Sequence, residues 1–87
     1  MDFGFWFQKA LEGIDRTAEN TVFLVKELFQ GTDWNGLATG DKLKFGSYFK
    51  NKVSTGNVPN VRYIGKAQNN SAQYMKIRRG ENETTNL

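Results

Sequence analysis

Basic side chains are concentrated in one part of this chain, and the chemistry that they offer is the binding of anions. Residues 42–79 contain nine lysines and arginines and neither aspartate nor glutamate. Residues 1–41 are acidic instead, with three basic residues against seven acidic ones. A segment that cannot neutralise its own charge attracts a polyanion. We therefore expect the second half of the chain to bind nucleic acid or another acidic partner.

Four of the nine basic residues fall within one expected helix, residues 39–54. Its apolar side chains Phe45, Phe49 and Val53 recur every four residues, so they form a single stripe that can face a core. Thr39 is a candidate N-cap, and Gly56 can adopt the left-handed conformation that ends a helix. The opposite side carries an ammonium, hydroxyls and an amide: Lys44, Ser47, Tyr48 and Asn51. These groups suit phosphate oxygens and base edges in a DNA major groove, although a solvated helix face has similar chemistry.

Shorter elements are expected before this helix. Apolar residues at helical spacing predict a first helix over residues 2–15. The β-branched and aromatic run at residues 21–25 favours a short strand, and residues 26–30 favour a short helix stopped by a glycine. One continuous helix over residues 21–30 fits the same letters. Turn-forming residues flank Trp34, which would anchor a connection to the core.

A basic β-hairpin is expected after the long helix. Residues 61–66 and 73–78 favour strands, with turn-forming residues 68–71 between them. Residues 80–87 are polar and aperiodic, so we expect a disordered tail after a single domain of residues 1–79. The expected element order is that of a winged helix-turn-helix, an α+β fold: helix, short strand, short helix, long helix and C-terminal hairpin. In it the long helix enters the major groove and the hairpin, or wing, contacts DNA beside it.

The expected DNA contacts are of two kinds. Residues on the exposed helix face are candidates for contacts with bases: Lys44, Ser47, Tyr48 and Asn51. The other basic residues of the acid-free segment are candidates for contacts with phosphates: Lys42, Lys50, Lys52, Arg62, Lys66, Lys76, Arg78 and Arg79. We expect double-stranded DNA as the partner.

The sequence contains no cysteine and no histidine. Disulfides, thiolate chemistry and zinc fingers are therefore excluded, and the usual general base is missing. No acid–base pair and no phosphate-binding glycine loop is recognisable, so we expect a non-enzymatic protein that uses no cofactor. The apolar N-terminus lacks a basic leader and is soon interrupted by charges, so we expect a cytoplasmic chain without a membrane segment.

The first expected helix is rich in aromatic residues. Phe3, Trp6 and Phe7 lie on its apolar stripe, and Phe5 lies off it. Core packing accounts for such a stripe, and part of this surface could also pair with a second copy of the protein. A homodimer through this helix is therefore a further hypothesis.

A spaced pattern of apolar, tryptophan and glycine residues runs through the middle of the chain: Leu28, Phe29, Trp34, Gly40, Gly46, Phe49 and Val53. In this pattern residues 22–78 resemble a small uncharacterised, winged-helix-like family from low-GC Gram-positive bacteria, their plasmids and phages. The chain departs from the pattern at Phe45, where the family tends to have leucine. The resemblance implies a mobile-element origin, such as a regulator or accessory protein, and no particular activity.

Partners other than DNA stay open at this point. A basic face also fits an acidic surface on a host protein, in which case the chain would be an interaction module or inhibitor. RNA would be favoured if Tyr63 and Tyr74 were exposed side by side as platforms for bases. Binding to random duplex DNA distinguishes the first hypothesis from the others.

Overall fold

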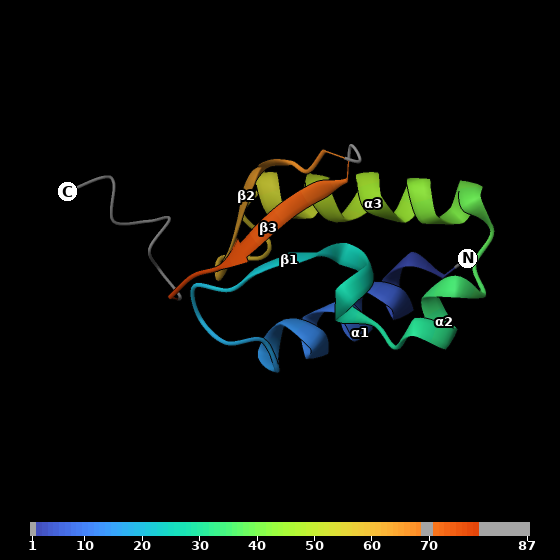
Figure 1. The fold of residues 1–87 in the computed structure, drawn as a ribbon, viewed down its shortest axis with the longest axis horizontal. Coiled ribbons are helices and arrows are strands. Elements are labelled where there is room, and N and C mark those ends of the chain that lie inside the picture. The colour runs from blue at the N-terminus through green and yellow to red at the C-terminus, as the bar shows by residue number, and fades with distance from the viewer. Residues whose placement is uncertain (1, 69–70, 79–87) are drawn as a thin grey trace.

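The computed structural model describes residues 2–68 and 71–78 and has an α+β fold (Figure 1). Its α-helices in these residues are α1 (Phe3–Asp15), α2 (Gly31–Asn35) and α3 (Thr39–Ser54). The strands β1 (Val22–Leu24), β2 (Val61–Lys66) and β3 (Ala72–Lys76) form one antiparallel sheet, and a short 3-10 helix, η1 (Val25–Leu28), follows β1. The expected α+β class is confirmed.

The predicted first helix is present and begins at Phe3, one residue later than predicted, because Asp2 is its N-cap. The Asp2 carboxylate accepts a hydrogen bond of 3.1 Å from the backbone N–H of Phe5, which caps one of the free amides of the first turn. Ala10 and Ile14 on the apolar stripe are buried. Phe3, Trp6 and Phe7 pack against the core cluster, so core packing accounts for most of the aromatic stripe.

The segment after α1 is a strand followed by a short helix, and the alternative of one continuous helix is wrong. Leu24 has an extended backbone, and its N–H donates a hydrogen bond of 2.7 Å to the Glu27 carboxylate. Phe23 lies opposite Tyr74 on β3, and the two rings are 6.0 Å apart. Pairing with a distant strand therefore fixes the extended conformation that the sequence alone left ambiguous.

Residues 31–35 form the helix α2, although the sequence predicted turns around Trp34. The Gln30 carbonyl accepts hydrogen bonds from the N–H groups of Asp33 and Trp34, and Gly31 therefore begins a helix instead of ending one. The Trp34 ring stacks on Phe29 at 5.4 Å and contacts Phe45 edge-on at 6.4 Å. The expected role of Trp34 as an anchor on the core is confirmed.

The long helix α3 has the predicted length and core stripe. Phe45 and Phe49 are fully buried, and Val53 is half-buried at the end of the stripe. The predicted N-cap is wrong, because Ala38 occupies the capping position and Thr39 is already helical. Gly56 has φ +83°, the left-handed conformation predicted for the end of this helix.

The predicted hairpin of β2 and β3 is confirmed, and its residues 69 and 70 lie outside the described part of the chain. The register shifts between Tyr63 and Gly65, and Gly65 has φ +126°, which suits glycine. The strand order is β1-β3-β2, so β1 joins the free edge of the hairpin. This long-range pairing was not predicted.

The core lies between α1, α3 and one face of the sheet. Figure 1 shows α3 on one side of β1 and α1 on the other. Tyr74 is fully buried there, 5.1 Å from the Phe49 ring, and its hydroxyl has no hydrogen-bond partner among the described residues. Burial raises the pKa of Tyr74 to about 12, and the neighbouring Tyr63 adds to the shift.

Candidate nucleic-acid interface

A groove of about 610 Å³ lies between the surface of α3 and the hairpin. Four lysines line it: Lys26 from η1, Lys42 and Lys50 from α3, and Lys66 from β2. None of the described residues that line it is acidic. We call this site the lysine groove. Its positive charges face one shared space, and such a space gathers phosphates.

Apolar groups form part of the wall between these lysines. Leu24, Val25 and Trp34 line the groove, and Gly46 of α3 leaves room because it has no side chain. The Nζ atom of Lys50 lies 4.5 Å from the centroid of the Tyr63 ring, so a cation–π contact holds this lysine at the hairpin. The groove therefore combines several cations with an apolar wall.

A ridge on α3 separates the lysine groove from a second hollow. Leu43 and Ser47 line both, and the second hollow, of about 510 Å³, is also lined by Phe3, Lys44, Tyr48 and Asn51. Leu43, Lys44, Ser47 and Asn51 are all exposed. All four residues predicted to face bases therefore line the second hollow, with Leu43 in addition.

Tyr48 differs from the other three because it is half-buried at the wall of the second hollow. Its ring stacks on Phe3 at 5.0 Å and meets Phe7 edge-on at 5.9 Å. The reason is the helical geometry, since a step of about 100° per residue puts Tyr48 about 60° from Phe45, at the border between the buried stripe and the exposed face. The same arithmetic puts Leu43 on the exposed face. The helical spacing in the sequence would therefore have been enough to include Leu43 in the predicted face.

The remaining predicted phosphate contacts are spread over other surfaces. The Lys52 ammonium lies 5.3 Å from the centroid of the Tyr48 ring, on the side of α3 that faces α1. Lys76 donates a hydrogen bond of 3.5 Å to the carbonyl of Asp15, at the end of α1. Arg62 is exposed and alternates with the inward-facing Tyr63. These residues do not join the lysine groove.

Two further basic residues follow the sheet. Arg78 is exposed beyond β3, and Arg79 lies outside the described residues. Lys26, which does line the groove, belongs to the acidic half of the chain and was not predicted. The pairing of β1 with β3 puts the start of η1 beside the hairpin, and that pairing is the signal that would have identified Lys26.

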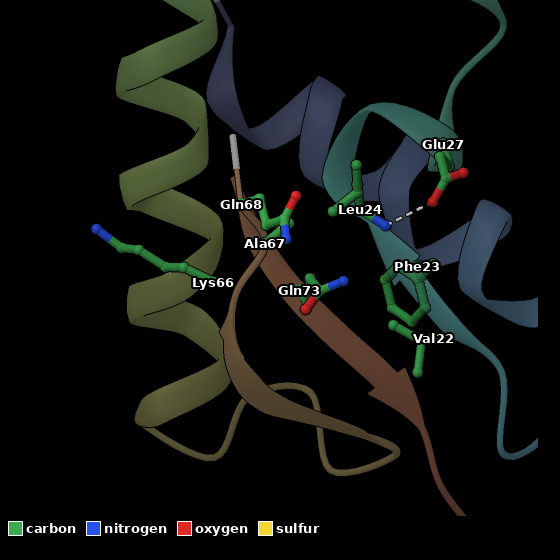
Figure 2. A pocket seen from close by; sticks show the side chains of 8 residues that line it. All are labelled: Val22, Phe23, Leu24, Glu27, Lys66, Ala67, Gln68 and Gln73. Atoms are coloured by element: carbon green, nitrogen blue, oxygen red, sulfur yellow. Dashed lines mark hydrogen bonds between the residues drawn. The ribbon is translucent and has the colours of Figure 1, made fainter. Parts of the chain in front are cut away.

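A third hollow, of about 780 Å³, lies between β1 and the end of the hairpin and has a different character. Figure 2 shows Gln68, Gln73 and Glu27 in it, with the Glu27 carboxylate bound to the Leu24 N–H. The Lys66 side chain extends away from these groups, across α3. Leu24 and Lys66 line both this hollow and the lysine groove, so a hollow containing an acid adjoins the groove.

Metal binding, membrane crossing and base stacking would each need a particular feature in residues 2–68 and 71–78. No three histidine, cysteine, aspartate or glutamate residues there cluster as metal ligands would. No helix in that part of the chain combines the length and the apolar character needed to cross a membrane. The suggested pair of RNA-stacking tyrosines is not formed, because Tyr74 is 0% exposed and meets Tyr63 at an interplanar angle of 62°.

The surface of α1 offers one exposed aromatic ring among its described residues. Phe5 is 54% exposed, whereas Phe3, Trp6 and Phe7 are half-buried against the core. The homodimer hypothesis therefore depends on Phe5 and on the charged residues that line a hollow with it, Lys9, Glu12, Arg16 and Asp33.

Comparison with known proteins identifies one matching domain family. The family described as "Domain of unknown function (DUF1413)" matches residues 8–76. Neither the curated proteins nor the solved structures contain a match to the chain.

Proposed function

This chain belongs to the DUF1413 family, and we propose that it is a small, non-enzymatic DNA-binding protein of the winged-helix kind. Helix α3 would enter the major groove, and the hairpin of β2 and β3 would be the wing beside it. The element order and the β1-β3-β2 sheet support this assignment. A regulatory or accessory role on DNA is the corresponding biological proposal.

The observation that carries the proposal is the position of the lysine groove. Its cations lie immediately beside the exposed ridge of α3, where Ser47 and Asn51 offer a hydroxyl and an amide. Phosphate contacts hold a protein in register on a duplex, and polar groups on an inserted helix read the bases. The arrangement supplies both kinds of contact on one surface.

Salt dependence gives the expected magnitude. Four phosphate contacts release about four counterions, so log K should fall with log salt with a slope of about −3.6. Affinity for a random duplex should then drop roughly 100-fold between about 50 and 200 mM salt. Fluorescence anisotropy with a labelled random duplex measures this slope directly.

Two variants from the acidic half of the chain provide a matched test. Lys26→Gln removes one charge from the groove, and Lys9→Gln removes one charge from the exposed surface of α1. We expect Lys26→Gln to reduce the magnitude of the salt slope by about one unit and Lys9→Gln to leave it unchanged. Equal effects of the two variants would show that the groove is not the binding site, and no duplex binding at low salt would refute the proposal itself.

An acidic protein is the second candidate partner. The observation that favours it is Leu43, which is 69% exposed beside the apolar wall of the groove and could pack against another protein. This alternative requires that the folded protein binds no DNA duplex at low salt.

A further inference from the structure

The most exposed large hydrophobic side chain in the described residues is on the helix proposed to enter DNA. Leu43 is 69% exposed, compared with 54% for Phe5, 46% for Val22 and 42% for Ile64. It lies on α3 between Lys42 and Lys44. An exposed leucine between two lysines contributes little to the core, so its surface is available for a contact with a ligand.

Leu43 belongs to the ridge that divides the two hollows of α3. Leu43, Ser47 and Asn51 are spaced by four residues, so they share one face of the helix. At a rise of about 1.5 Å per residue they extend over about 12 Å along the helix axis, a length of roughly three to four base-pair steps of about 3.4 Å. The hollows on both sides leave this ridge protruding.

Cations flank the ridge on both sides. Lys42 and Lys50 lie on the side of the lysine groove, and Lys44 lies on the side of the second hollow. The phosphates of the two DNA strands border the major groove in the same way. A ridge with cations on both flanks therefore fits between two phosphate backbones with Leu43 directed at the base edges.

We propose that Leu43 contacts the C5-methyl group of thymine, so that α3 selects DNA sites with a T·A pair opposite this residue. The inference rests on the proposed DNA-binding function. A leucine side chain cannot donate or accept a hydrogen bond, so it cannot read the donors and acceptors of the other base edges. Thymine is the base that presents an apolar group in the major groove.

Deoxyuridine provides the test, because it lacks this methyl group and keeps the charge and base pairing of thymidine. A preferred site is selected from a random duplex library with the full chain. Each thymidine of the selected site is then replaced in turn by deoxyuridine. We expect one or two replacements to weaken binding about three- to five-fold each, the effect of leaving one buried methyl group out of the contact.

The variant Leu43→Ala completes the test. It should bind the thymidine duplex less tightly than the parent, and it should no longer distinguish thymidine from deoxyuridine. Val22→Ala, which shortens an exposed apolar side chain on β1, is the matched control and should keep the discrimination. Thermal melting of both variants should match that of the parent within a few degrees, because both side chains are exposed.

The outcomes distinguish the role of Leu43 from DNA binding itself. Equal binding of thymidine and deoxyuridine duplexes by the parent, or a selected site without thymine, would overturn the role of Leu43 and leave DNA binding in place. Discrimination that persists in Leu43→Ala would assign the methyl contact to another residue and would also overturn it. Absence of binding to any duplex would overturn both proposals and favour an acidic protein as the partner of this ridge.

Discussion

Replacing Gly13 by alanine should destabilise the fold, even though alanine is the better helix former. Gly13 is buried in α1 where the helix meets η1. A Cβ atom at this position would collide with the carbonyl oxygen of Leu28 and would lie 2.9 Å from its Cα and Cβ atoms. The obstacle is mainly backbone, so it cannot yield by a change of rotamer.

The magnitude follows from two opposing terms. Carbon atoms in contact prefer separations of about 3.5–4.0 Å, so α1 and η1 must move apart by roughly 0.6–1 Å. Overpacking of this kind costs about 1–3 kcal/mol, and we place Gly13→Ala at the upper end because backbone must shift. The higher helix propensity of alanine offsets about 1 kcal/mol of this destabilisation. The net loss of unfolding free energy should be about 1–2 kcal/mol.

Gly46 in α3 supplies the matched control. It is also inside a helix, and a Cβ atom there would meet no atom within 4 Å. Gly46→Ala should therefore gain up to about 1 kcal/mol from helix propensity and from the reduced entropy of the unfolded chain. The two identical substitutions should change stability in opposite directions.

Thermal and urea denaturation followed by circular dichroism would measure both variants. For a chain of this size 1 kcal/mol corresponds to about 4–8 °C in Tm, so Gly13→Ala should melt roughly 5–15 °C below the parent and Gly46→Ala a few degrees above it. A Gly13→Ala protein as stable as Gly46→Ala would refute the close approach of α1 to η1. That result would also remove the support that positions Lys26 in the lysine groove.

Two further predictions concern the core. Phe49→Ala should cost about 3–5 kcal/mol, because it empties a fully buried ring site between α3 and Tyr74, and urea denaturation would show an unchanged midpoint if that face were not buried. The pKa of Tyr74 is raised from 10.0 to about 12, so above pH 10 the folded state keeps a proton that the unfolded state loses. The free energy of unfolding should therefore fall by about 2–3 kcal/mol between pH 10 and 12. The variant Tyr74→Phe should not lose stability between pH 10 and 12. At neutral pH its free energy of unfolding should be higher by about 1 kcal/mol, because the substitution removes a buried hydroxyl without a described partner. Equal losses of stability with rising pH in parent and variant would contradict this prediction.

Periodicity was sufficient to predict the longer elements. The apolar stripes of α1 and α3 repeat over several turns, and the strands of the hairpin alternate around a turn-rich segment, so each pattern is averaged over many residues. Helix α2 has five residues, too few for a period to be recognised, and contacts of Trp34 with Phe29 and Phe45 help to hold it in place. Such short elements depend on tertiary packing, which a local pattern does not contain.

The candidate site was predicted less well because it depends on which elements become neighbours. A helical pattern gives the direction of a side chain relative to its own axis, and this was enough for Ser47 and Asn51. It gives no information about the partner of β1, and the β1–β3 pairing is what puts Lys26 beside the hairpin. The position of Lys76 at the end of α1 is likewise a consequence of the sheet register.

The acid-free segment of the sequence and the basic surface of the fold are consequently different sets of residues. At about 0.1 M salt exposed charges interact strongly only within roughly 10 Å, so a polyanion responds to cations that converge in space rather than to the net charge of a segment. The fold brings Lys26 from the acidic half into the lysine groove, and it directs Lys52 and Lys76 toward α1. If DNA binding depended on the acid-free segment as a whole, neutralising Lys76 would weaken it and neutralising Lys26 would not. If binding depends on the lysine groove, neutralising Lys26 must weaken it more than neutralising Lys76.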